Sequence, residues 1–252
     1  MRLTLLHVFS GCAVALALVT SACKGEEPPP RPAAVANPVD PATAGSITGV
    51  VKFDGKVPAA RTITMDSDPY CEKQPTNTTE NIVVGDGSGL QNVFVYVKDG
   101  LGDRTFPVPS TPVVLDQKGC RYVPHVLGVQ VGQTLEIASS DNTLHNVHAM
   151  GQQNREFNMA HPLAGIKHTR VFSTKEVMVP FKCDVHKWMN AFLGVLDHPF
   201  YAVTTGNGHF ELKGLPPGTY TIEVWHEKLG TQTQMVTVGE KQTSEASFTF
   251  KS

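Results

Sequence analysis

Apolar and polar residues alternate along most of the chain from Ser46 onward, with the period of two that is typical of half-buried strands. Runs that alternate, or that are rich in β-branched and aromatic residues, cover residues 47–53, 93–97, 112–115, 126–131, 134–137, 176–181 and 191–196. The C-terminal part continues with Phe210 and Leu212, then Tyr220, Ile222 and Val224, then Met235, Val236 and Val238, then Phe248 and Phe250. Turn signals such as Asp54-Gly55 and Asp99-Gly100 close two of these runs. No segment has a long helical stripe, so we predict an all-β fold, as one sandwich or a pair of sandwiches.

Composition and charge limit the classes of protein to which the chain can belong. It has 252 residues, of which 40% are hydrophobic and 17% charged, enough apolar material for a packed core. The formal net charge is −2, and no long run of Lys and Arg occurs. Nucleic-acid-binding proteins carry a basic footprint, so we expect no nucleic-acid partner.

The N-terminus is predicted to be a targeting signal and not part of the folded protein. A charged Arg2 precedes an apolar stretch, and the small residues Thr20-Ser21-Ala22 stand directly before Cys23. This arrangement resembles the lipobox of bacterial lipoproteins, which implies a signal peptide over residues 1–22 and a lipid on Cys23. A plain signal peptide cut near Ala22 is the alternative. Both kinds of signal peptide imply that the mature protein functions outside the cytoplasm. Lipidation further implies a periplasmic protein anchored to a membrane, with the outer membrane favoured.

Residues 23–45 are rich in proline and alanine and almost free of large apolar side chains. Such a segment cannot bury enough surface to fold, so we interpret it as a semi-extended tether.

The residues with the clearest chemistry are Cys183, His186 and Met189, which are spaced Cys-x-x-His-x-x-Met directly after a predicted strand. A thiolate, an imidazole and a thioether are soft ligands that favour copper, and a second histidine would complete a blue-copper set. His145 and His148 are the two candidates for that position. Positions three apart on a strand face opposite sides, so we expect only one of them to reach the metal.

This motif resembles the cupredoxin family of blue copper proteins. The Cys183 loop is similar to the short ligand loop of amicyanin, and His145-Asn146 is similar to the His-Asn pair of plastocyanins and amicyanins. The resemblance covers roughly residues 110–198 and implies a Greek-key β-sandwich with one type 1 copper, bound by His145, Cys183, His186 and Met189. It also implies that the outer edge of His186 lies in an apolar surface patch where redox partners dock. Trp188 is a candidate member of that patch, with ordinary core packing as the alternative.

Cys71 and Cys120 remain once Cys23 is assigned to the lipid and Cys183 to copper. In an oxidising compartment a structural disulfide is the economical interpretation, and two reduced cysteines are the alternative.

Two stretches outside the copper motif resemble the carboxypeptidase regulatory-like domain, a transthyretin-like β-sandwich. Residues 203–220 are similar to the second half of that domain, and residues 49–58 to its first strand and turn. We therefore expect an N-terminal β segment over 46–108, a cupredoxin domain over 109–198 and a regulatory-like domain over 199–252. In a nested arrangement, which we favour, 46–108 and 199–252 form one split sandwich. In a serial arrangement they are separate.

We predict from these features a lipid-anchored electron-transfer protein that is not an enzyme. Its partner would be a redox protein such as a periplasmic cytochrome or dehydrogenase. The alternative is a copper-handling or non-redox binding lipoprotein that docks a partner through its β-sandwich. A copper oxidase or nitrite reductase would need a further copper site, which the other histidines do not indicate.

Overall fold

The computed structural model describes residues 39–251, and its regular structure there consists of strands and two single-turn 3-10 helices, η1 (Cys71–Lys73) and η2 (Asp86–Ser88). The predicted all-β fold is therefore confirmed. None of the helices within this range is long and apolar enough to cross a bilayer. The predicted signal peptide, Cys23 and most of the predicted tether lie outside the described residues.

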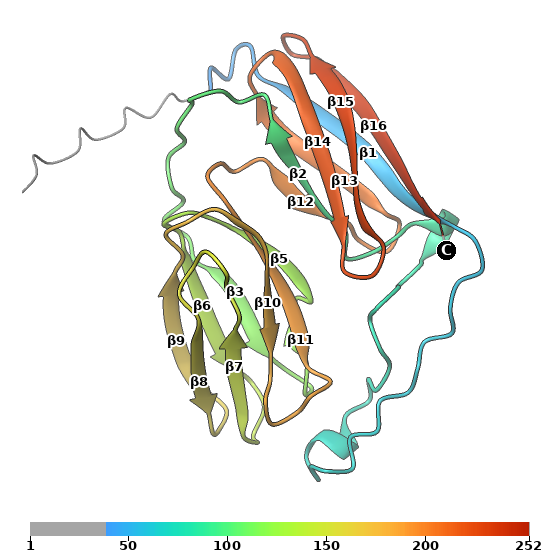
Figure 1. The fold of residues 1–252 in the computed structure, drawn as a ribbon, viewed down its shortest axis with the longest axis vertical. Helices are drawn as coiled ribbons and strands as arrows, with labels where there is room; N and C mark the ends of the chain where they lie inside the picture. Colours follow the sequence, from blue (N-terminus) through green and yellow to red (C-terminus); the bar gives the residue numbers. More distant parts are fainter. Residues whose placement is uncertain (1–38, 252) are drawn as a thin grey trace, which may run out of the picture. The chain divides into compact units, whose positions relative to one another are not determined.

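One pair of sheets forms the first sandwich (Figure 1). Its sheets have the strand orders β13-β1-β16 and β12-β2-β14-β15. The strands are β1 (Gly45–Asp54), β2 (Phe94–Asp99), β12 (Tyr201–Val203), β13 (His209–Leu215), β14 (Gly218–His226), β15 (Gly230–Val238) and β16 (Thr243–Lys251). Ile47, Phe210 and Phe248 of one sheet share a buried cluster with Val95 and Ile222 of the other. The alternating positions of the sequence are thus the positions that fill this core.

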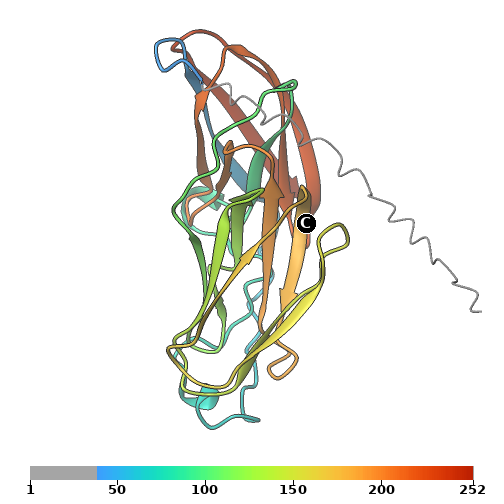
Figure 2. The same cartoon turned by 90° about the vertical axis from the view of Figure 1, so that its left-hand side faces the viewer.

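A second pair of sheets carries the copper motif, with strand orders β5-β11-β10-β7-β8 and β4-β3-β6-β9 (seen from the side in Figure 2). The strands are β3 (Val113–Gln117), β4 (Tyr122–Val123), β5 (Val126–Gln130), β6 (Thr134–Ser139), β7 (His145–Ala149), β8 (Phe157–His161), β9 (Lys167–Val171), β10 (Glu176–Lys182) and β11 (Asn190–Leu196). Leu115 and Ile137 of one sheet pack in a common core with Val147, Phe181 and Leu193 of the other.

The first sandwich contains strands from both ends of the described chain. β1 lies between β13, to which it is antiparallel, and β16, to which it is parallel. β2 in turn lies between β12 and β14. The second sandwich, β3 to β11, therefore occupies the sequence between two parts of one sandwich. This is the nested arrangement of the two alternatives above.

The two sandwiches meet through a small apolar cluster of Phe94, Tyr96, Val126 and Leu196. The close approach of β11 to Phe94 requires glycine at position 194, because a Cβ there would lie 2.3 Å from the Phe94 ring. Gly128 of β5 lies similarly close to Tyr201, because a Cβ there would be 2.4 Å from the tyrosine ring. Glycines of both β5 and β11 therefore contact aromatic side chains of the first sandwich.

The chain between β1 and β2 has little regular structure beyond η1, η2 and isolated bridges such as Thr62 with Thr78 (Figure 1). We refer to residues 61–80 as the 61–80 segment. Cys71 within it forms a disulfide with Cys120, so the predicted pairing is confirmed. The disulfide fastens the segment to the turn between β3 and β4.

Candidate copper site

The four candidate ligands come from the start of β7 and from the loop between β10 and β11. His145 is the first residue of β7, Cys183 directly follows β10, and Met189 directly precedes β11. β7 and β10 are antiparallel, with Lys182 opposite His148. The loop that leaves β10 therefore runs toward the start of β7, where His145 lies.

The donor atoms of His145, Cys183 and His186 all lie within 4.8 Å of one another. The two imidazoles face each other through their Nδ1 atoms, which are 2.9 Å apart. These three residues and Met189 are each at most 2% exposed. The site is therefore a closed cluster of soft donors inside the protein.

Backbone hydrogen bonds give the ligand loop its tight shape. The Cys183 N–H donates to the Met189 carbonyl at 3.1 Å, and the Met189 N–H donates to the His186 carbonyl at 2.9 Å. These bonds turn the chain back on itself, so that Met189 returns to the core that Cys183 enters.

The sulfur of Cys183 is held in a setting that favours the thiolate. Burial alone would raise its pKa, but hydrogen bonds from His145 and His186 and from the backbone of Asn146 and His186 lower the pKa to about 6. In the metal-free protein at neutral pH the group is therefore mainly a thiolate, the form that binds metals. Asn146 also fixes the loop, because its Oδ1 accepts from the Asp184 N–H at 2.6 Å.

Each candidate histidine has a carboxylate on its other ring nitrogen. His145 Nε2 lies 3.0 Å from Asp141 Oδ2, and His186 Nε2 lies 3.3 Å from Asp68 Oδ2. A carboxylate at Nε2 keeps a proton on that nitrogen, so Nδ1 is the nitrogen that would bind a metal. Burial lowers the pKa of His145, but the bonds with Asp141 and Cys183 outweigh it and raise that pKa to about 9.

The two carboxylates are themselves anchored. Asp141 accepts hydrogen bonds from the Gly119 and Cys120 N–H groups, both at 2.7 Å. Asp68 accepts from the Tyr70 N–H at 2.7 Å and from Thr143 Oγ1 at 2.5 Å. Although burial opposes it, these bonds lower the pKa of both Asp68 and Asp141, so both are carboxylates at neutral pH.

Of the two histidines that could complete the ligand set, the structure brings His145 to the cluster and leaves His148 outside it. The His148 side chain is 16% exposed, and its ring nitrogens lie 2.5 Å from Glu156 Oε1 and 3.0 Å from Asp184 Oδ2. Its neighbours are thus carboxylates beside the ligand loop, and it is not a member of the soft donor cluster.

The surroundings of His186 differ from what the cupredoxin resemblance implies. Its outer edge was expected at the surface, but His186 is only 2% exposed, so that expectation is wrong. Asp68 and Cys71 cover the edge, with Cys71 Sγ 3.8 Å from His186 Nε2. Trp188 is partly buried beside the His186 ring, with centroids 4.9 Å apart, and its Nε1 donates to the Cys120 carbonyl. Its docking role stays a prediction.

Asp68 and Asp141 are the site residues that sequence reasoning missed. Asp141 is four residues before His145, which is a weak signal because aspartate is common in turns. Asp68 is three residues before Cys71 and could have been considered only after the disulfide had brought the 61–80 segment to the site.

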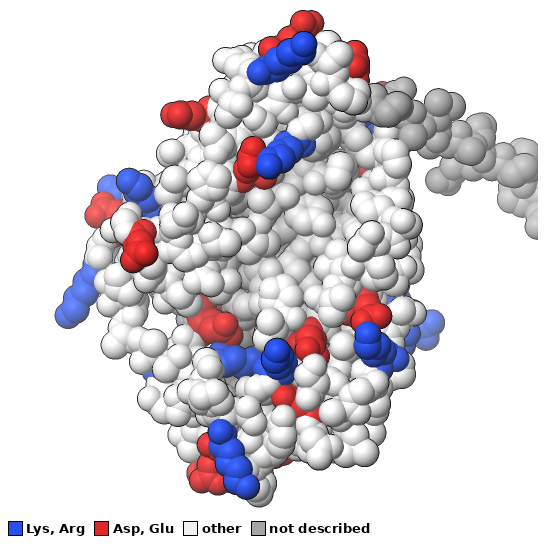
Figure 3. Space-filling view, turned by 180° about the vertical axis from the view of Figure 1, so that it is seen from behind, with Lys and Arg blue, Asp and Glu red and all other residues white. Residues whose placement is uncertain are grey.

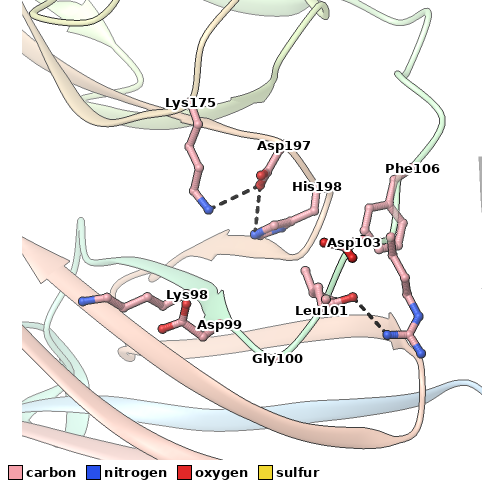
Figure 4. Close-up of a pocket in the computed structure, with 11 residues that line it drawn as sticks. Lys98, Asp99, Gly100, Leu101, Asp103, Phe106, Lys175, Asp197 and His198 are labelled. Atoms are coloured by element: carbon pink, nitrogen blue, oxygen red, sulfur yellow. Dashed lines mark hydrogen bonds and ion pairs between the residues drawn. The ribbon is translucent and has the colours of Figure 1, made fainter. Parts of the chain in front are cut away.

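A cavity of about 380 Å³ elsewhere in the described residues offers no comparable chemistry (Figure 4). None of the four candidate ligands lines it. Two of its lysines are in ion pairs, Lys98 with Glu223 at 2.6 Å and Lys175 with Asp197 at 3.4 Å, and Arg104 donates to the Leu101 carbonyl. On the face in Figure 3, basic and acidic side chains are interspersed and gather into no patch of one sign.

Comparisons with known proteins find one family model and several solved structures, each of which matches part of the chain. The family model of the carboxypeptidase regulatory-like domain matches residues 194–251. No curated protein matches the sequence. Among solved structures, a copper-containing nitrite reductase from Thermus scotoductus is 18% identical over 40% of this chain, with a TM-score of 0.33. The match spans only 26% of that reductase chain.

Two smaller proteins are matched over nearly their whole length. A mutant of amicyanin in its Cu(I) form is 19% identical, and the match covers 40% of this chain and 97% of that one, with a TM-score of 0.30. A purple cupredoxin from Nitrosopumilus maritimus is 21% identical, and the match covers 34% of this chain and 99% of that one, with a TM-score of 0.28.

Proposed function

We propose that this protein transfers single electrons through one type 1 copper ion bound by His145, Cys183, His186 and Met189. The observation that carries the proposal is the convergence of two imidazole Nδ1 atoms and a thiolate within 4.8 Å. Harder ions such as Mg²⁺ and Ca²⁺ prefer oxygen ligands, whereas imidazole, thiolate and thioether suit copper. The residues therefore fit the metal that the sequence motif indicates.

Copper, when bound, supplies a one-electron change of oxidation state, and the protein's part is to keep the ligands in place. Asp141 and Asp68 hold the two imidazoles, and the backbone bonds of the loop hold Cys183 and Met189. Ligands that barely move between oxidation states keep the reorganisation on electron transfer small. The buried setting also excludes water from the ligands.

We infer a periplasmic location with a lipid anchor at Cys23, supported by the lipobox-like Thr20-Ser21-Ala22-Cys23. A redox protein, such as a periplasmic cytochrome or dehydrogenase, would be the partner.

Cys23→Ser should release the protein from the membrane fraction, because the acylated cysteine would be its only lipid anchor. A mutant that still sediments with membranes would exclude lipidation at Cys23.

The alternative is a copper-handling protein that passes its metal on. Such a role requires ligands that a recipient can reach, but all four candidates are buried. The proposed electron carrier is not an enzyme, because it needs only the one metal site and no substrate pocket beside it.

The test is to load purified protein with Cu(II) and to record its visible spectrum and electron paramagnetic resonance. We expect one copper per chain and an intense visible band from thiolate-to-copper charge transfer. Cys183→Ser should abolish the band, because a serine oxygen is a harder and less covalent ligand. A wild-type protein without an intense visible band would exclude the type 1 site.

His145→Ala and His148→Ala form a matched pair for the choice of histidine. We expect His145→Ala to lose the wild-type band and to recover a coloured site with added imidazole. His148→Ala should keep the wild-type spectrum. The reverse pattern would mean that His148, not His145, is the ligand. Rapid loss of copper to a Cu(I) chelator would favour the copper-handling alternative.

A further inference from the structure

The outer edge of His186 is covered by a part of the chain that does not belong to either sandwich. Asp68 Oδ2 lies 3.3 Å from His186 Nε2, and Cys71 Sγ lies 3.8 Å from the same atom. Both residues are in the 61–80 segment. The edge is therefore covered by the buried sulfur of Cys71 and by a carboxylate whose side chain is 18% exposed.

The 61–80 segment is fastened to the second sandwich at several points. The disulfide joins Cys71 to Cys120, and Tyr70 Oη donates to Asp141 Oδ1 at 3.2 Å. Arg121 forms an ion pair with Glu80 at 2.7 Å and also donates to the Thr76 and Thr78 carbonyls. All of these contacts follow Asp68 in the sequence, and Met65, on its N-terminal side, is buried in the core of the second sandwich.

The disulfide is inaccessible as well as close to the site. Cys71 and Cys120 are both fully buried, so a thiol in solution cannot reach either sulfur while the segment is closed. The arrangement is therefore that of a permanent clamp and not of an exposed, exchangeable disulfide.

We propose that Asp68 is a positioning residue for His186 and that the 61–80 segment is a fixed cap that closes the outer imidazole edge. This inference rests on the proposed copper function and extends it. A partner or a small redox reagent would then have no contact with His186 Nε2. Electrons would enter and leave by another part of the surface around the site.

The carboxylate also has an electronic effect. A carboxylate oxygen 3.3 Å from the outer nitrogen, as Asp68 Oδ2 is from His186 Nε2, polarises the ring N–H and makes the imidazole a stronger donor. Stronger donation and a nearby negative charge both stabilise Cu(II) more than Cu(I). Asp68 should therefore lower the reduction potential relative to a neutral residue at the same position.

The first experiment compares the reduction potentials of copper-loaded Asp68→Asn and Asp66→Asn. Asp66 is an exposed carboxylate in the same segment, so it controls for the loss of one negative charge nearby. We expect a higher potential in Asp68→Asn, and a much smaller change in Asp66→Asn, with the visible band kept in both. Equal potentials in the two variants would overturn the positioning role.

The second experiment uses metal-free protein, so that it does not depend on copper. Diethyl pyrocarbonate modifies accessible histidines, and peptide mapping gives the rate at each one. In the wild type we expect His186 to react far more slowly than the exposed His209. In the double variant Cys71→Ser/Cys120→Ser, His186 should react at least several-fold faster.

His226, which is 1% exposed in the first sandwich, is the control for global unfolding. It should stay protected in the double variant. If His226 becomes reactive together with His186, the segment does not open as a separate cap and the inference fails. An unchanged His186 rate would overturn it too.

The two proposals fail in different ways. If the wild type shows no intense visible band, the copper function is wrong, whatever the modification rates are. If the band is present but the potentials and the His186 rates do not respond, only the cap and the role of Asp68 are wrong.

Discussion

At the scale of single residues, Met189 is the candidate ligand expected to bind copper most weakly. A long axial thioether tunes the reduction potential without being needed for the thiolate charge transfer. Met189→Leu should therefore keep copper and the visible band while raising the potential, because Cu(II) loses more donation than Cu(I). Leucine has a similar volume, so the free energy of unfolding should fall by less than about 1.5 kcal/mol.

The control is Met235→Leu, at a methionine that is 73% exposed. Spectroelectrochemistry of both variants gives the comparison. A Met189→Leu protein with the wild-type potential would show that the thioether is not a ligand.

The candidate ligands could be predicted because three of them lie within one short stretch of sequence. Cys183, His186 and Met189 have a spacing that carries its own chemical meaning. Asp68 and Asp141 could not be found in that way, because each contacts its histidine through the folded chain and has no distinctive spacing. The covering of the His186 edge could not be predicted for the same reason, because nothing near His186 in the sequence indicates a contact with the 61–80 segment.

At the scale of elements, the strands predicted from alternation are mostly those that fill a core. Five strands were not predicted, and four of them, β4, β8, β9 and β12, lie at the edge of their sheets. An edge strand is more exposed, as the sequence KHTRV of β9 shows, so the alternation of apolar residues is weak there. β7 was missed for another reason, because its polar residues serve the site.

The contact between β11 and β2 yields a prediction at this scale. A Cβ on Gly194 would lie 2.3 Å from the Phe94 ring, so Gly194→Ala forces a shift in a buried contact. We expect the free energy of unfolding to fall by about 1–3 kcal/mol, the usual cost of overpacking. Urea denaturation measures it.

Gly206→Ala is the matched control, because the nearest atom to its new Cβ would be 3.9 Å away. It should change the stability by less than about 1 kcal/mol. Equal losses in the two variants would mean that the close contact of Gly194 with Phe94 is not responsible.

At the scale of the whole described molecule, the two sandwiches are joined by polar as well as apolar contacts. His125 Nε2 lies 2.7 Å from Glu227 Oε1, and the other ring nitrogen, Nδ1, lies 3.1 Å from the carbonyl of Asn190, next to Met189. His125 precedes β5 of the second sandwich, and Glu227 follows β14 of the first. The first sandwich is thus connected to the end of the ligand loop.

Buried histidines in both sandwiches make the stability depend on pH. Burial lowers the pKa of His161, His198 and His226 to about 4 in each case. In the unfolded chain a histidine has a pKa of about 6.5, so between pH 6 and pH 4 the unfolded state binds more protons. Stability should therefore fall as the pH falls through this range. His145, with its pKa raised to about 9, is protonated in both the folded and the unfolded protein over this pH range, so it does not contribute to the fall in stability.

His226→Gln tests this dependence in the metal-free protein. One buried histidine of this kind should account for about 2 kcal/mol of the stability lost between pH 6 and pH 4. The variant should therefore lose about that much less than the wild type over the same range, as measured by urea denaturation at both pH values. His209→Gln, at an exposed histidine of β13, should lose as much as the wild type does. If His226→Gln lost as much as His209→Gln, His226 would not be the neutral buried group that its surroundings indicate.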